Sequence, residues 1–137
     1  MKTLFVAVRV TDLDHSLSFY TALGYVEVGR VEGGDGSRMV VLRFPDEPVA
    51  SLELVHRPGD GPVDVGRGVD HLAIQVSALA ATLERLTDAG LEPAPVECPG
   101  GPDGPRTSWL TDPDGYRVEL VEWPAGHPDG ISAADFS

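Results

Sequence analysis

The chain has 137 residues, a length that suits one domain or two small halves sharing a core. Its composition, 42% apolar and 23% charged, is ordinary for a globular protein, and its net charge of −12 argues against partners such as nucleic acid or an anionic membrane surface. No apolar run approaches the roughly 20 residues of a membrane-spanning helix, and the single cysteine, Cys98, excludes an internal disulfide and favours a reducing cytoplasm.

A strand is predicted over residues 4–10, because apolar side chains occupy every second position there. The side chains expected to pack against helices are Leu4, Val6, Val8 and Val10. Those expected on the opposite, helix-free face are Phe5, Ala7 and Arg9.

An amphipathic helix is predicted next, with Asp12 as its N-cap and Gly24 at its C′ position. Its apolar stripe has helical spacing and comprises Leu13, Leu17, Tyr20 and Leu23. Three strands are then predicted over residues 26–31, 39–44 and 51–54, with Gly- and Pro-rich loops between them. The first part of the chain therefore follows the order strand, helix, strand, strand, strand.

The second part repeats this order at a fixed offset of 66 residues. VRVTDLDHSLSFYTALGY, from Val8, aligns with IQVSALAATLERLTDAGL, from Ile74. Ser77 is the predicted N-cap of the second helix, and Gly90 is its predicted C′ glycine. In the strand before that helix, the residues expected to pack are Leu72, Ile74 and Val76, and those expected to face away are His71, Ala73 and Gln75.

The same offset continues without a gap to the last strand, and it places Glu53 of SLEL on Glu119 of RVEL. Further strands are predicted over residues 95–98 and 107–111. Glu53, His71 and Glu119 are thus expected together on the helix-free face. One glutamate in a strand is usually solvated, but two at equivalent positions with a histidine favour a functional site.

We expect an α+β fold of two repeated βαβββ modules that form a concave mixed sheet. The single domain spans residues 1–123, with module one at 1–56, a Gly/Pro-rich linker at 57–68 and module two at 69–123. A C-terminal tail follows over residues 124–137.

The motifs RVTDLDHSLSFYTALGY, GVDHLAIQV and DPDGYRVELVEW resemble those of the glyoxalase/bleomycin-resistance/dioxygenase superfamily, also called vicinal oxygen chelate, over about residues 4–122. The resemblance implies paired βαβββ modules that enclose a divalent metal ion. It places the ligand positions at Phe5, Glu53, His71 and Glu119.

Glu53, His71 and Glu119 together resemble the ligand set of glyoxalase I, whereas extradiol dioxygenases and fosfomycin-resistance enzymes use two histidines and one glutamate. The resemblance therefore implies a metal-dependent lyase or isomerase acting on a small carbonyl compound or its thiol adduct. The metal would be zinc, nickel, cobalt or manganese, with Glu119 as the catalytic base. Phe5 has no lone pair, so water, or His127 of the tail, would complete the coordination.

The alternative is a non-catalytic, metal-free binding protein of the bleomycin-resistance type. In either case we place Phe5, Arg9 and Trp109 at the pocket for a small molecule. Core packing for Trp109 and an ordinary surface position for Arg9 are the competing interpretations. By resemblance we expect a homodimer, and the site could lie within one chain or between two.

Overall fold

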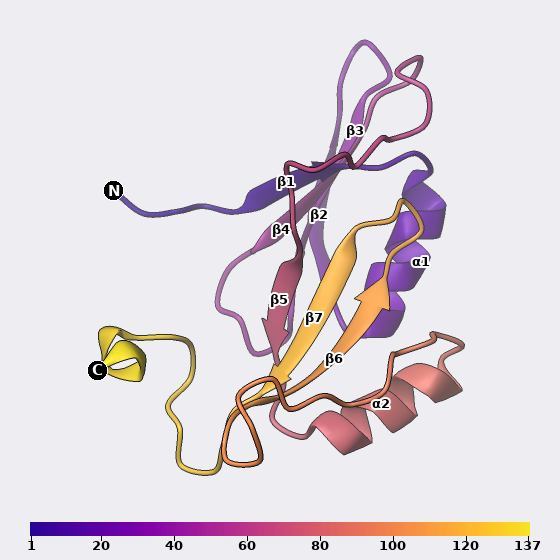
Figure 1. Ribbon diagram of the computed structural model, residues 1–137. Helices are drawn as coiled ribbons and strands as arrows, with labels where there is room; N and C mark the ends of the chain where they lie inside the picture. The colour runs from indigo at the N-terminus through magenta and orange to yellow at the C-terminus, as the bar shows by residue number, and fades with distance from the viewer. The chain divides into compact units, whose positions relative to one another are not determined.

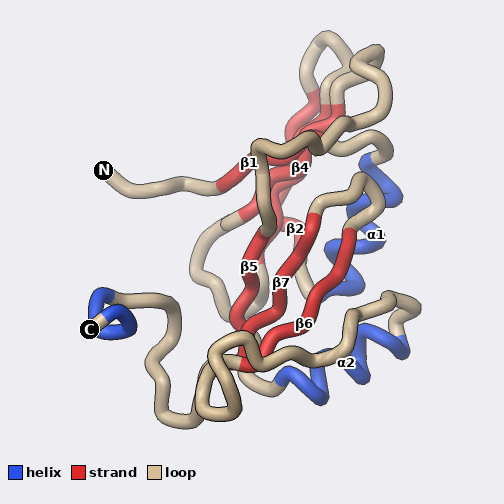
Figure 2. Tube along the Cα trace, viewed as in Figure 1, coloured by secondary structure: helices blue, strands red, loops and turns tan.

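The computed structural model describes residues 1–137 as two compact units, each containing one sheet and one α-helix (Figures 1 and 2). Unit one comprises Met1–Val69 and Asp112–Gly115, and unit two comprises Asp70–Thr111 and Tyr116–Ser137. The predicted α+β class is confirmed. Neither α-helix has the length and apolarity needed to cross a membrane.

Unit one contains a four-stranded sheet with the strand order β1-β4-β3-β2. Its elements are β1 (Val6–Arg9), α1 (Leu13–Leu23), β2 (Val26–Glu32), β3 (Arg38–Arg43) and β4 (Leu52–His56). β1 runs parallel to β4, whereas the β3–β4 and β2–β3 pairs are antiparallel. The parallel pair is possible because α1 and two strands separate β1 from β4 in the chain.

Helix α1 begins and ends at the predicted caps. The Asp12 carboxylate accepts a hydrogen bond from the His15 amide at 3.0 Å, and Gly24 ends the helix at a φ of 128°, which a side chain would disfavour. The helix packs against β4. Its buried side chains are Leu13, Ser16, Phe19, Tyr20 and Leu23.

The outer end of β1 differs from the prediction. Leu4 and Val6 were expected to pack against helices, but they are 73% and 57% exposed, whereas Val10 is buried. β1 is an edge strand, and α1 packs against its neighbour β4, so in unit one no helix covers the beginning of β1.

Unit two contains a three-stranded sheet with the strand order β5-β7-β6. Its elements are β5 (Leu72–Gln75), α2 (Leu79–Asp88), β6 (Arg106–Thr111), β7 (Arg117–Glu122) and a 3-10 helix, η1 (Ala133–Phe136). The strand predicted over residues 95–98 is wrong: only an isolated bridge between Glu97 and Thr107 forms there. Pro93, Pro95 and Pro99 lack the amide hydrogens that a longer ladder needs.

Helix α2 is capped differently from the prediction. Its N-cap is Ala78 rather than Ser77, and no side chain of the cap residue accepts a hydrogen bond. Instead, the Leu79 amide donates to Glu122 Oε2 at 2.5 Å. A carboxylate from the end of β7 therefore replaces the local cap and also complements the positive end of the helix dipole.

The parallel strand pairs of the two units share one register. Ala7 lies opposite Glu53 in unit one, and Ala73 lies opposite Glu119 in unit two, so the offset of 66 residues is preserved. The antiparallel pairs differ: Val41 lies opposite Glu53, but Trp109, not the sequence equivalent Thr107, lies opposite Glu119. This shift of two residues leaves each side chain on its original face.

Candidate functional site

His71 and Glu119 come together on the helix-free face of unit two. Val118 and Leu120 are fully buried in β7, so strand alternation directs Glu119 to the opposite face. His71 directly precedes β5, the neighbour of β7. Its Nε2 lies 3.2 Å from Glu119 Oε2, and the two side chains are 31% and 20% exposed. The partial burial excludes much of the solvent but leaves the pair accessible to a ligand.

Asp70 holds the other side of the His71 ring. Its Oδ1 lies 2.5 Å from His71 Nδ1, and its own side chain is 94% exposed. A neutral imidazole has one N–H and cannot donate to two carboxylates. With Nδ1–H directed at Asp70, the Nε2 lone pair faces Glu119, and that arrangement is favourable only with a second proton or a cation between the two atoms.

The donor set therefore fits a divalent cation at His71 and Glu119. Metal-binding histidines usually donate their other ring N–H to a carboxylate, and Asp70 is the carboxylate that would accept this hydrogen bond from His71. Imidazole nitrogen and carboxylate oxygen are both suitable ligands for zinc, nickel, cobalt and manganese.

Trp109 forms one wall beside this pair. It lies opposite Glu119 in the β6–β7 register, and its ring meets the His71 ring edge-on, with centroids 5.1 Å apart and an interplanar angle of 80°. The Arg117 guanidinium lies 4.3 Å from the centroid of the same indole ring. Trp109 thus contacts both the His71 imidazole and the Arg117 guanidinium, on the face that also carries the Glu119 carboxylate.

Asp70 and Arg117 were not among the predicted site residues. Asp70 stands directly before His71 in GVDHLAIQV, which was a usable signal for a carboxylate partner. Arg117 stands two residues before Glu119 in β7, so strand alternation predicts that both side chains lie on the same face. The contact of Arg117 with Trp109 could not be predicted, because that contact depends on the shifted β6–β7 register.

The remaining predicted site residues belong to unit one. Glu53 is partly buried in β4, between Ala7 of β1 and Val41 of β3. Phe5 is partly buried and immediately precedes β1. Arg9, a predicted pocket residue, makes an ion pair with Asp60 of the linker. Strand pairing therefore places Glu53 beside small and apolar neighbours.

The structure brings His71 and Glu119 into contact, and Trp109 adjoins them within unit two. No group of three or more His, Cys, Asp or Glu side chains is arranged to hold a metal ion. The three-ligand set with Glu53 therefore remains a prediction.

The other histidines have other surroundings. His15 is exposed on α1, and His56 has a buried Nδ1 without a hydrogen-bond partner. Both ring nitrogens of His127 are occupied, one by the Pro128 carbonyl oxygen and one by Asp135, each at 2.6 Å. His127 is therefore not free to act as the substitute ligand considered above.

Comparison with known proteins agrees with this architecture. The sequence model of the Glyoxalase/Bleomycin resistance protein/Dioxygenase superfamily matches residues 3–120. A probable lactoylglutathione lyase of Synechocystis sp. is 30% identical over 89% of this chain and 95% of its own length. The lactoylglutathione lyase of Salmonella typhimurium is 33% identical over 89% and 93%, respectively. A glyoxalase I mutant structure from Zea mays superposes with a TM-score of 0.79 at 25% identity, over 90% of this chain and 45% of that one. The chain therefore belongs to the Glyoxalase/Bleomycin resistance protein/Dioxygenase superfamily.

Proposed function

We propose that the protein is a glyoxalase I-like, metal-dependent lyase that acts on the thiol adduct of a small α-ketoaldehyde. The main observation in support is the imidazole of His71 held between the carboxylates of Asp70 and Glu119. The full-length similarity to lactoylglutathione lyases supports the same reaction class.

His71 and Glu119 would hold the metal ion, and Glu53 is the predicted third ligand. The bound ion would supply Lewis-acid polarisation of a carbonyl oxygen. Asp70 would keep the His71 tautomer that presents the Nε2 lone pair to the ion. Phe5 cannot contribute a ligand, which leaves a position for water or substrate.

Glu119 would act as the base. Its carboxylate would take the proton from the carbon that bears the sulfur and hydroxyl groups, and would return it to the neighbouring carbonyl carbon. The hydroxyl proton moves to the new alcohol oxygen, so the thiol adduct becomes a thioester without an external oxidant or reductant. Glu119 is only 20% exposed, which excludes much of the water that would compete for the proton in transit.

Arg117 and Trp109 would form the wall that receives the substrate. The indole offers an apolar surface, and the guanidinium stacked on it adds a positive charge beside the reacting groups. This pairing suits an adduct that carries an anionic group.

The experiment that tests the proposal measures the metal content of untagged protein by mass spectrometry, with nickel, zinc, cobalt and manganese added back. The variants His71→Ala and Glu119→Gln should each lose metal, whereas the matched control Glu84→Gln, an exposed residue of α2, should keep it. Turnover of ketoaldehyde–thiol mixtures should fall with the metal. Equal retention in all three variants would contradict the proposal.

Phe5 provides a second test. Phe5→His would place a ligand at the position equivalent to His71, and we expect tighter metal binding or faster turnover. No gain in either quantity would mean that Phe5 does not occupy a ligand position.

A non-catalytic small-molecule binding protein is the second candidate, and the observation that favours it is Phe5. An aromatic side chain at that position suits an apolar cleft rather than a metal site. Absence of binding for all four metals, together with saturable binding of an aromatic ligand that Phe5→Ala weakens, would establish this alternative.

A homodimer in the cytoplasm completes the proposal. Unit one exposes apolar side chains on both of its edge strands, which a second copy would cover; they include Val6, Val26, Val28 and Val31. Cys98 is exposed and unpaired, which is compatible with a reducing compartment. Light scattering across a dilution series would measure the oligomeric state.

A further inference from the structure

Gln75 anchors the C-terminal segment to the sheet of unit two. Ile74 is buried beneath it, so alternation places Gln75 on the helix-free face, opposite Val121 of β7. The Gln75 side chain makes three hydrogen bonds to later residues. Its Oε1 accepts from the Trp123 indole N–H at 2.8 Å and from the Gly130 amide at 2.7 Å, and its Nε2 donates to Asp129 at 2.7 Å. One side chain therefore holds both ends of the segment that contains His127.

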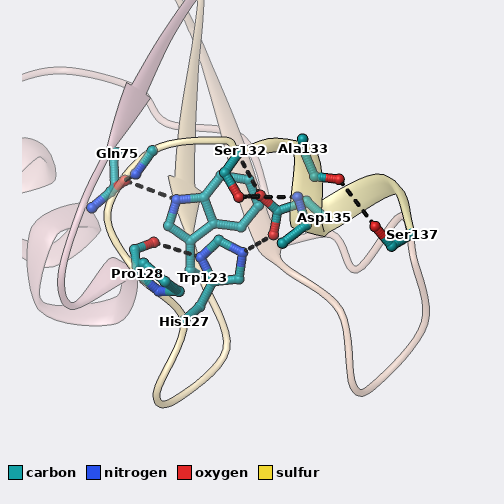
Figure 3. A network of polar contacts seen from close by, with 10 residues as sticks. Gln75, Trp123, His127, Pro128, Ser132, Ala133, Asp135 and Ser137 are labelled. Carbon is teal, nitrogen blue, oxygen red and sulfur yellow. Dashed lines mark hydrogen bonds and ion pairs between the residues drawn. The ribbon is translucent and has the colours of Figure 1, made fainter.

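His127 closes the segment on itself (Figure 3). Its ring stacks on Trp123, with centroids 4.5 Å apart and planes inclined by 18°. Nδ1 faces the Pro128 carbonyl oxygen and Nε2 faces Asp135 Oδ1, each at 2.6 Å. Both neighbours are acceptors, so both ring nitrogens must carry a proton, and the geometry is that of an imidazolium ion.

Asp135 is itself held in place by its own turn. Its Oδ2 accepts from the Ser132 amide at 2.6 Å and from the Ser132 hydroxyl at 3.2 Å, and this capping box begins η1. The carboxylate that meets His127 is thus positioned by local backbone rather than by chance side-chain contact. The charged group that interacts with His127 is Asp135, and the nearby Asp129 is occupied by Gln75.

We propose that residues 124–137 form a strap that docks at Gln75 on the helix-free face of unit two, is latched by the His127–Asp135 ion pair, and is released when His127 loses its proton. Loss of either ring proton leaves a lone pair facing an oxygen at 2.6 Å and removes the cation from the face of Trp123.

The strap has a defined place relative to the candidate site. Gln75 lies two residues beyond Ala73, which is the register partner of Glu119. The strap therefore bounds the end of the face beyond Val121. This device follows from the fold of unit two and does not depend on the proposed enzymatic activity.

The direction of the pH dependence follows from the two partners. Asp135 and the Pro128 carbonyl raise the pKa of His127 above its ordinary value of 6.5, so the latch is complete below that value and is lost as the pH rises through the raised pKa. Ser132 and His127 lower the pKa of Asp135, so the latch is lost at the acid end only when the pH falls through that lowered value.

The test follows the Trp123 indole N–H by 15N-resolved NMR from about pH 5 to about pH 9. The two indole signals are assigned with Trp109→Phe. We expect the Trp123 signal to shift with one titration step above the ordinary histidine range, and to resemble the high-pH position at every pH in His127→Gln. His15→Gln, at an exposed position of α1, is the matched control and should retain the step. A Trp123 signal that does not titrate, or that titrates equally in His127→Gln, would overturn the proposal.

Amide hydrogen exchange gives an independent measurement. The protection factor of Gly130, corrected for the intrinsic pH dependence of exchange, should fall roughly tenfold in both variants, because His127→Gln removes the charge-assisted latch and Gln75→Ala removes the acceptor of the Gly130 amide. Exchange at the core amide of Leu120 should be unchanged, which shows that unit two remains folded. Unchanged protection of Gly130 in both variants would mean that Gln75 and His127 do not hold the strap.

Discussion

Replacing Tyr20 with Phe should lower the free energy of unfolding by about 2 kcal/mol. The Tyr20 hydroxyl donates to Asp112 Oδ2 at 2.7 Å, and the two residues are only 2% and 4% exposed. Phe retains the edge-on contacts of the ring with Phe19 and Tyr25, at centroid distances of 5.0 and 5.9 Å. The loss is therefore one hydrogen bond to a buried carboxylate, which is worth about 1.5–3 kcal/mol.

Urea denaturation followed by circular dichroism would measure this loss, and the melting temperature should fall by about 6–10 °C for a chain of this size. The control is a double-mutant cycle with Asp112→Ala, in which Tyr20→Phe should cost at least about 1 kcal/mol less than in the original protein. A cost that is the same in both backgrounds would refute the assignment to this hydrogen bond. Asp112 also begins the DPDG turn into β7, so the variant would test what holds the start of the strand that carries Glu119.

Three further outcomes are expected. Leu86→Ala should cost about 2–5 kcal/mol in chemical denaturation, because this α2 side chain is fully buried and Ala leaves a cavity. Asp70→Ala should weaken metal affinity about tenfold by calorimetry, the low end for a partner of a ligand, since the Asp70 side chain is largely exposed and water can replace it; unchanged affinity would remove Asp70 from the site. Arg30 lowers the pKa of Glu27, so this pair is kept at neutral pH and is lost as the pH falls through the lowered value. Glu27→Gln should nevertheless leave the urea midpoint at pH 7 unchanged, because the pair is exposed.

The helices and most of the strands could be predicted because their signals are local and repeated. Asp12 and Gly24 have the chemistry of the caps that they form, and the apolar stripe of α1 has the period of a helix. The offset of 66 residues gave the Ala7–Glu53 and Ala73–Glu119 pairings the same register. Where two parts of a chain carry the same pattern, each strengthens the interpretation of the other.

The errors arose where distant residues override local chemistry. Ser77 is a suitable N-cap, but Glu122, at the end of β7 and 43 residues after Leu79 in the sequence, supplies the acceptor to α2 instead. The strand predicted over residues 95–98 does not form because prolines flank and interrupt it, and the prediction gave their missing amide hydrogens too little weight. Leu4 and Val6 have the alternation of a buried strand, but an edge position decides their exposure.

Strand alternation predicted the common face of His71 and Glu119, but it did not predict the position of Trp109 beside them. Side chains two residues apart in a strand share a face, and the distance of 3.2 Å between His71 Nε2 and Glu119 Oε2 agrees with this prediction. The place of Trp109 beside them depends on the two-residue shift between the antiparallel pairs, which a gapless sequence repeat conceals. The network around His127 could not be predicted, because the tail has no periodicity and its contacts are to single side chains.

The shared register has a consequence for how such a protein can evolve. Phe5 and His71 are equivalent under the repeat, as are Glu53 and Glu119, so one equivalent pair differs between the two repeats and the other is identical. In a homodimer of single modules, every substitution changes both copies at once. Duplication in one gene removes that constraint, since one copy can acquire an aromatic residue at this position while the other retains a histidine. A substitution at this position therefore changes one repeat alone, and it leaves in place the parallel strand pairing that both repeats share.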